Sequence, residues 1–172
     1  MSVTEFIHQD KEARRFSFEV LPPLKGTGTA KLFADIDKLK EFDPAYINIT
    51  THHSEFVYRE LKNGQYERCR IRRRPGTIAI AAAIQQRYGI PVQPHVICSG
   101  ATIEDIEYEL LDLQFLGISD LLLLRGDKAK EDNRFQPTPG GHAHTTDLMK
   151  QVKQFNETSR SEERRVGKEC RS

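Results

Sequence analysis

Apolar residues recur along this chain with two alternating periods, one typical of strands and one typical of helices. Four short segments have the strand pattern, namely residues 16–21, 46–50, 95–98 and 121–125. Each is followed by a segment with a helical pattern or helical end signals, namely residues 30–42, 77–89, 102–117 and a fourth helix that Thr145 should cap. A strand followed by a helix, four times over, predicts a parallel sheet with helices packed outside it.

Local signals refine the expected element boundaries. Thr102 and Thr145 are placed to cap the third and fourth helices, and Gly117 is placed to end the third. Pro94 lacks an N–H donor, so we expect it at the first position of the third strand and not inside it. The polar segment 51–76 is expected to be a long loop between the second strand and the second helix.

The predicted fold class is therefore α/β, with parallel β/α units that correspond to the first four units of a (β/α)8 TIM barrel, apparently truncated. Residues 1–156 form this predicted half barrel. Residues 157–172 differ in kind, because they carry five basic and four acidic residues and Val166 as the only aliphatic one. We expect this second segment to be a solvated, charged tail, and it is a candidate non-native segment.

Charge and cysteine content exclude several classes of protein. The 172 residues include 26 basic and 25 acidic ones, so no net field favours nucleic acid or an anionic membrane. Three widely spaced cysteines suggest neither a disulfide framework nor a zinc site. The N-terminal residues lack the apolar core of a signal peptide, and no apolar run approaches the length of a membrane span. We expect a cytoplasmic protein without a nucleic-acid or membrane partner.

Glu19 is the first candidate for chemistry. Strand alternation places Ser17, Glu19 and Leu21 on one face and two phenylalanines on the other. The aromatic face should pack against helices, so Glu19 should point into the barrel near the end of the strand where barrel enzymes keep their active sites. A carboxyl group in apolar surroundings can keep its proton near neutral pH and act as a general acid. The alternative is a strand-end glutamate paired with a nearby arginine.

Other polar residues fall near the same ends of the predicted strands. Thr50 ends the second strand, where it either hydrogen-bonds a cofactor or caps a turn. His95 begins the third strand, where a histidine with satisfied core contacts is the plainer interpretation. Arg125, Gly126 and Asp127 follow the fourth strand at once. Arginine can clamp phosphate, and glycine permits close approach of the backbone.

Two weaker signals remain. Five arginines lie within residues 68–74, which could bind RNA or phosphate, although a charged loop explains them as well. The spacing of His52, His53, His142 and His144 matches no zinc signature, so no metal site is expected.

Together these motifs resemble a known family. The similarity covers about residues 14–156 and rests on FSFEVLPP (16–23), RRPGT (73–77), HTTDLM (144–149) and the segments INIT, PHVIC and LLLLRGD. They are similar to the N-terminal half of bacterial methylenetetrahydrofolate reductase. The resemblance implies an FAD-dependent (β/α)8 barrel that reduces 5,10-methylenetetrahydrofolate to 5-methyltetrahydrofolate with NADH or NADPH. It also implies a folate substrate and, for full-length members, a homo-oligomer.

The resemblance also implies roles for single residues. Glu19 matches the general acid that helps to protonate the folate, and Asp127 matches an aspartate near the flavin and the folate. Further positions match FAD-binding residues of the family: Thr50, His95, Arg125, Gly126, Asp127, His144 and Thr145.

Three competing interpretations stay open. Four further β/α units that such a barrel needs are missing here, so the chain could be a non-catalytic half-barrel fragment. It could instead be a phosphate- or RNA-binding module that uses Arg68–Arg74. It could also belong to a different barrel enzyme, such as a folate-dependent methyltransferase.

Overall fold

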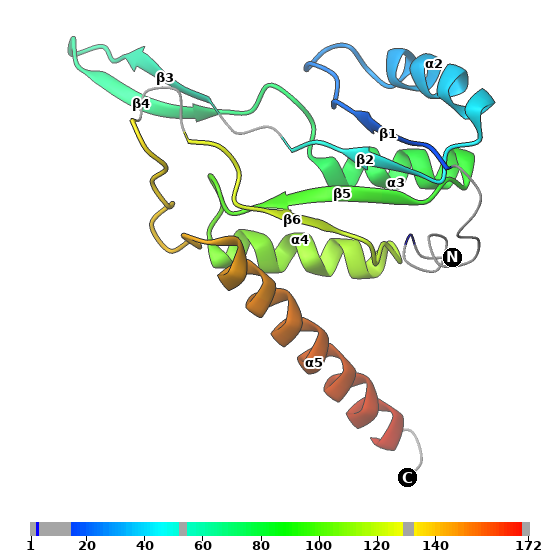
Figure 1. Cartoon of the computed structure of the whole chain (residues 1–172). Helices are drawn as coiled ribbons and strands as arrows, with labels where there is room; N and C mark the ends of the chain where they lie inside the picture. Colours follow the sequence, from blue (N-terminus) through cyan, green and yellow to red (C-terminus); the bar gives the residue numbers. More distant parts are fainter. Residues whose placement is uncertain (1–2, 4–14, 52–54, 129–132, 170–172) are drawn as a thin grey trace. The chain divides into compact units, whose positions relative to one another are not determined.

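The computed structural model describes residue 3 and residues 15–51, 55–128 and 133–169 (Figure 1). Its contacts divide the chain into two compact units. The first unit comprises residues 1–96 and 116–122, and the second comprises residues 97–115 and 123–172. Among the described residues, no helix is both long and apolar enough to cross a membrane.

Parallel strands form the centre of the first unit. Strands β1 (Ser17–Val20), β2 (Tyr46–Ile49) and β5 (Val92–Ile97) lie side by side in that order. Glu19 is in register with Asn48 on the neighbouring strand. These strands confirm the parallel α/β prediction for this part of the chain.

One face of this sheet supplies much of the core. Ile47 and Ile49 of β2 are completely buried, because successive strand residues alternate between faces and these two lie on the apolar one. Helix α3 (Thr77–Tyr88) packs against β2 and ends, as predicted, at Gly89 with a φ of +66°. Helix α2 (Ala30–Leu39) is followed by a 3-10 turn, η1 (Lys40–Phe42), so the predicted helix 30–42 is divided near its end.

The position predicted for Pro94 is wrong. Pro94 lies inside β5 and is in register with Ile49 of β2. The Ile47 N–H donates to the Pro91 carbonyl over 2.9 Å. In a parallel ladder, backbone groups of alternate residues face the same neighbour. Pro91 and Gln93 therefore face β2, and Pro94 turns its nitrogen away from it. The missing N–H costs the β2–β5 ladder no donor.

The predicted loop 51–76 is also wrong, because it contains an antiparallel hairpin. Strands β3 (Glu55–Glu60) and β4 (Tyr66–Ile71) pair with each other (Figure 1). At the turn the Leu61 N–H donates to the Gln65 carbonyl over 2.7 Å, and Gly64 has a φ of +76°. Asn-Gly between two alternating segments is a strong hairpin signal. The high charge of both strands concealed this signal, since neither strand has an apolar face.

The second unit contains helix α4 (Ile103–Phe115), strand β6 (Leu122–Leu124), which begins one residue before this unit, and helix α5 (Thr145–Glu169). Thr102 caps α4 as predicted: the Asp105 N–H donates to its hydroxyl over 3.0 Å, and its own N–H donates to the Asp105 carboxylate over 2.9 Å. This reciprocal pair satisfies two donors at the start of the helix.

Strand β6 pairs with residues that continue β5. The Cys98 N–H donates to the Leu124 carbonyl over 3.1 Å, and the Ser99 N–H donates to the Arg125 carbonyl over 2.9 Å. The strand order is therefore β1-β2-β5-β6. The strand is not fully buried although its sequence is apolar throughout, because Leu124 is 37% exposed.

Helix α5 differs from its prediction at the start. It begins with Thr145 itself, and the carbonyl of His144 accepts the N–H of Leu148 over 3.4 Å. His144 therefore occupies the cap position, and Thr145 lies in the first turn.

The backbone of α5 also continues to Glu169, through most of the segment 157–172 that the sequence set apart. Glutamate, arginine and lysine are good helix formers, which suits the continuation of the helix. The domain boundary at residue 156 stays a prediction.

Candidate functional site

Polar side chains gather on one face of the sheet in the first unit. Glu19, Asn48 and Gln93 are in register across β1, β2 and β5. One residue beyond the Ile49–Pro94 pair, Thr50 follows the end of β2 and His95 lies in β5. Residues two apart on a strand share a face. Glu19, Asn48, Thr50 and His95 therefore lie on the face opposite to the buried isoleucines.

The structure brings Glu19 and His95 together. The distance between the His95 Nε2 and Glu19 Oε2 atoms is 3.9 Å, and their side chains are 7% and 58% exposed. This contact is too long for a hydrogen bond. The expected apolar surround of Glu19 is not found, since more than half of its side chain is exposed. Among the described residues, the basic side chain that lies beside Glu19 is this histidine.

The environment of His95 favours the neutral imidazole. Burial lowers the pKa of His95, and the nearby Glu19 carboxylate opposes this effect to a smaller extent. Near neutral pH the ring therefore has one N–H donor and one acceptor nitrogen. Such a ring can exchange hydrogen bonds with a ligand without placing a second charge in the core.

Two buried polar atoms of this face have no hydrogen-bond partner within the described part of the chain. They are the His95 Nε2 and the Asn48 Oδ1. Leaving a buried polar atom without a partner costs about 1–3 kcal/mol. Buried orphan atoms are rare in folded proteins, and each one requires an explanation, such as a ligand. Asn48 was not among the predicted site residues, although the alternation of β2 had placed it on the same face as Thr50.

Two threonines tie the strand ends together. The Thr50 hydroxyl donates to the Val20 carbonyl over 3.1 Å, and the Thr50 N–H donates to the same oxygen over 3.1 Å. The Thr51 hydroxyl donates to the His95 carbonyl. The hydroxyl proton of Thr50 therefore serves the backbone, while its oxygen can still accept a hydrogen bond from a ligand.

The arginine-rich segment is anchored beside the end of β1. The Arg74 guanidinium donates to the Pro22 carbonyl, and the Lys25 N–H donates to the Arg73 carbonyl over 2.7 Å. Residues 68–71 belong to strand β4, so the run is not the uniform charged loop that the sequence predicted.

The second unit holds the predicted Arg125, Gly126 and Asp127. The Arg125 guanidinium lies 4.7 Å from the centroid of the Phe135 ring, a cation–π contact. Gly126 has a φ of +82°, a conformation that favours glycine. The Ser99 hydroxyl donates to the Asp127 carbonyl over 3.0 Å and so joins the loops that follow β5 and β6.

The remaining predicted positions, His144 and Thr145, lie at the N-terminus of α5 in the second unit. The neighbouring His142 has its Nε2 atom 2.6 Å from the Gln151 Oε1 atom. In the described ranges, no cluster of three or more histidine, cysteine or acidic side chains could hold a metal ion. His52 and His53 lie outside those ranges.

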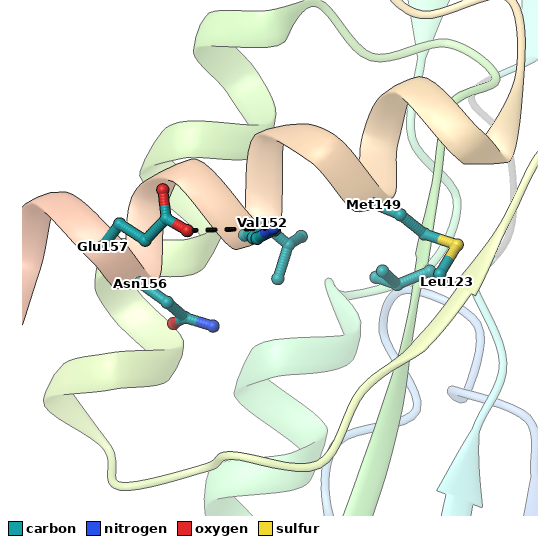
Figure 2. A pocket seen from close by; sticks show the side chains of 6 residues that line it. Leu123, Met149, Val152, Asn156 and Glu157 are labelled. Atoms are coloured by element: carbon teal, nitrogen blue, oxygen red, sulfur yellow. Dashed lines mark ion pairs between the residues drawn. The ribbon is translucent and has the colours of Figure 1, made fainter.

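A groove of about 440 Å³ in the second unit is separate from the predicted site residues (Figure 2). It is lined by Leu123, Met149, Val152, Lys153, Asn156 and Glu157. Figure 2 shows Met149 beside Leu123, and the ion pair between Lys153 and Glu157 over 4.0 Å. No predicted site residue lines this groove.

Parallel strands with helices packed against them define an α/β protein, and α/β proteins commonly bind ligands at the carboxyl edge of the sheet. The family profile of methylenetetrahydrofolate reductase matches residues 5–161. The chain belongs to this family.

Curated relatives agree with the family assignment. The chain is 28% identical over 138 residues to methylenetetrahydrofolate reductase (NADH) 1 of Arabidopsis thaliana, which covers 80% of the chain and 21% of the plant protein. It is 24% identical over 157 residues to methylenetetrahydrofolate reductase 2 of Saccharomyces cerevisiae, covering 89% of the chain and 24% of the yeast protein.

The match to a bacterial relative covers a larger share of the relative's length. The chain is 26% identical over 141 residues to 5,10-methylenetetrahydrofolate reductase of Pectobacterium carotovorum, covering 81% of the chain and 41% of the bacterial protein. In these three comparisons the chain spans between 21% and 41% of the relative's length.

Proposed function

We propose that this chain forms part of an FAD-dependent reductase that converts 5,10-methylenetetrahydrofolate to 5-methyltetrahydrofolate with NADH or NADPH. The observation that carries the proposal is the position of Glu19, 3.9 Å from the Nε2 atom of the buried His95 on the polar face of the sheet. This Nε2 atom has no hydrogen-bond partner in the described residues. Family membership gives this geometry its substrate.

The residues present fit a flavin. In the first unit, the orphan His95 Nε2 offers a buried hydrogen-bonding atom. In the second unit, taken by itself, the exposed Arg125 suits a phosphate and Gly126 permits close backbone approach. The flavin-binding residues under this proposal are Thr50, His95, Arg125, Gly126, Asp127, His144 and Thr145. When bound, FAD supplies hydride transfer between the nicotinamide and the folate.

Glu19 acts as the general acid under this proposal. Its carboxyl group donates a proton to the folate, the bond between a ring nitrogen and the bridging carbon opens, and the resulting iminium carbon becomes able to accept hydride. The side chain of Glu19 is 58% exposed, so its carboxyl group is accessible to solvent and to a substrate. Asp127 places a negative charge that favours the cationic iminium.

The proposal extends to the wider setting. The proposed substrate is a folate, the proposed co-substrate is NADH or NADPH, and the proposed compartment is the cytoplasm. Full-length members are proposed to form homo-oligomers. The Arabidopsis relative has NADH in its name, which makes NADH the first nicotinamide to test.

Flavin binding by the purified chain is the primary test. We expect the quenching of FAD fluorescence on titration with the 172-residue chain, and a flavin absorbance band that persists through gel filtration. A chain that leaves FAD fluorescence unchanged at saturating protein concentration contradicts the proposal for this chain.

The variant Glu19→Gln tests the assigned general acid. It is made in a full-length, catalytically active reductase that contains this segment. The variant should bind FAD normally and lose folate reduction by roughly 10²- to 10⁴-fold, the usual contribution of a general acid. Reduction of the flavin by NADH is the internal control, because that step needs no proton from Glu19. Undiminished folate reduction would remove Glu19 from this role.

A further inference from the structure

The proposed function uses Glu19, Thr50 and His95 on the polar face of the sheet but gives Asn48 no role. Asn48 lies on the central strand of β1, β2 and β5, in register with Glu19 on one side and with Gln93 on the other. Its position is therefore inside the row of polar residues and not at its margin.

The local sequence makes asparagine an unexpected choice at this position. Asn48 stands between Ile47 and Ile49, which are completely buried on the opposite face. Asparagine is disfavoured in strands, where branched apolar residues fit better. Its amide oxygen, Oδ1, is buried and has no hydrogen-bond partner in the described part of the chain. The fold therefore gains no hydrogen bond through this oxygen.

A second orphan atom lies on the same face. The His95 side chain is 7% exposed, and its Nε2 atom also has no partner among the described residues. Two buried polar atoms without partners, on adjacent strands of one sheet face, indicate a ligand that brings complementary polar groups. An amide oxygen can only accept hydrogen bonds, so the group that meets Asn48 must be an N–H or an O–H.

We propose that Asn48 is a further ligand-binding residue of this site, whose Oδ1 atom accepts a hydrogen bond from an N–H or O–H group of the bound flavin. This inference rests on the proposed function, because it takes the flavin as the ligand of this face. It adds a residue that the family resemblance did not assign.

Asn48→Leu separates a ligand-binding role from a structural one. Leucine is close to asparagine in size and shape but has no acceptor. If the amide oxygen serves only a ligand, the apo variant should unfold at the same temperature as the parent chain or higher, because a buried unsatisfied group is removed. Its Kd for FAD should rise roughly tenfold, as expected for the loss of one buried hydrogen bond.

The experiment is an FAD fluorescence titration and a thermal melt without FAD, for the parent chain, Asn48→Leu and the control Asn63→Leu. Asn63 is an exposed amide in the β3–β4 turn, hydrogen-bonded to Gln65, so its substitution should leave the Kd for FAD unchanged. Asn48→Ala serves as a second variant that cannot overpack the site, and it should show the same loss of FAD affinity.

Each outcome is decisive. A weakened Kd together with an undiminished apo melting temperature supports the inference. FAD binding that is equal in the parent and both Asn48 variants overturns the inference and leaves the proposed function intact. Loss of the folded state in both variants also overturns it, because Asn48 would then be a structural residue. If the parent chain itself does not bind FAD, the proposed function fails first and the inference fails with it.

Discussion

The parallel sheet and the β3–β4 hairpin of the first unit both have alternating side chains, but they use the alternation in different ways. In the sheet, Ile47 and Ile49 are completely buried while Asn48 between them lies on the polar face. In the hairpin, Tyr58 and Tyr66 are 68% and 65% exposed. The same period of two therefore produces a core in one region and a solvated surface in the other. Alternation of side chains along a segment therefore indicates a strand, whereas the burial of either face depends on which elements pack against that face.

The largest expected effect comes from emptying the buried face. Ile49→Ala should lower the free energy of unfolding by about 2–5 kcal/mol, because it removes packed atoms and leaves a cavity. Tyr58→Ala in the hairpin should change it by less than about 0.5 kcal/mol, as usual for exposed positions. Urea denaturation of both variants measures the contrast. Equal losses would mean that the hairpin shares the core of the sheet.

The pH dependence of stability should depend on His95. Its pKa is lowered in the folded state, so the unfolded state binds the proton more tightly and stability falls as the pH drops below the ordinary histidine pKa of about 6.5. His95→Gln should remove this contribution and flatten the stability profile below about pH 6.5, where the unfolded-state histidine takes up its proton. Thermal melts at several pH values measure the slope. An unchanged slope would show that another group is responsible.

Two glycines with left-handed backbones allow a matched comparison of the regions. Gly89 ends α3 with a φ of +66°, and Gly64 forms the hairpin turn with a φ of +76°. Alanine at either position should cost about 1 kcal/mol in local backbone strain. For Gly89→Ala the cost should appear in global unfolding. For Gly64→Ala we expect faster hydrogen exchange confined to β3 and β4. Exchange that also rises in β2 would show that the hairpin and the sheet open together.

The smallest effect is expected at the exposed ion pair of the hairpin. Arg59 donates to the Glu67 carboxylate over 2.8 Å, and this hydrogen bond lowers the pKa of Glu67. Arg59→Ala should return the pKa of Glu67 toward its ordinary value, which an NMR titration of the side-chain carboxyl measures. The melting temperature should stay the same, because exposed pairs contribute little. A clear fall in the melting temperature would contradict the view of the hairpin as a solvated region.

Much of the fold could be predicted from local signals. The capping of α4 by Thr102 and the end of α3 at Gly89 follow from residue type and spacing alone, and both are confirmed. The hairpin could have been predicted from Asn63-Gly64, but its charged strands have no apolar face by which to recognise them. The place of Pro94 inside β5 could not be predicted, because it depends on which neighbour each backbone group faces.

The candidate site was predictable in part. The strand ends that carry Glu19 and Thr50 could be read from alternation, and the family resemblance added His95. The exposure of Glu19 and the unpartnered oxygen of Asn48 could not, because both depend on side chains from neighbouring strands.

Patterns within the sequence were enough to predict the order of the parallel strands and the helices between them, the family, and the residues that alternate onto the polar side of each parallel strand, but not the β3–β4 hairpin. These properties are local, since they depend on spacing, capping groups and residue type within one segment. Three features are visible only in the tertiary structure. Glu19 lies beside His95 across the sheet, and His95 is buried and favours its neutral form. In addition, two buried polar atoms of the described residues have no hydrogen-bond partner. The physical reason is that burial and hydrogen-bond satisfaction are properties of neighbours distant in the chain, which become fixed only when the strands pair in register.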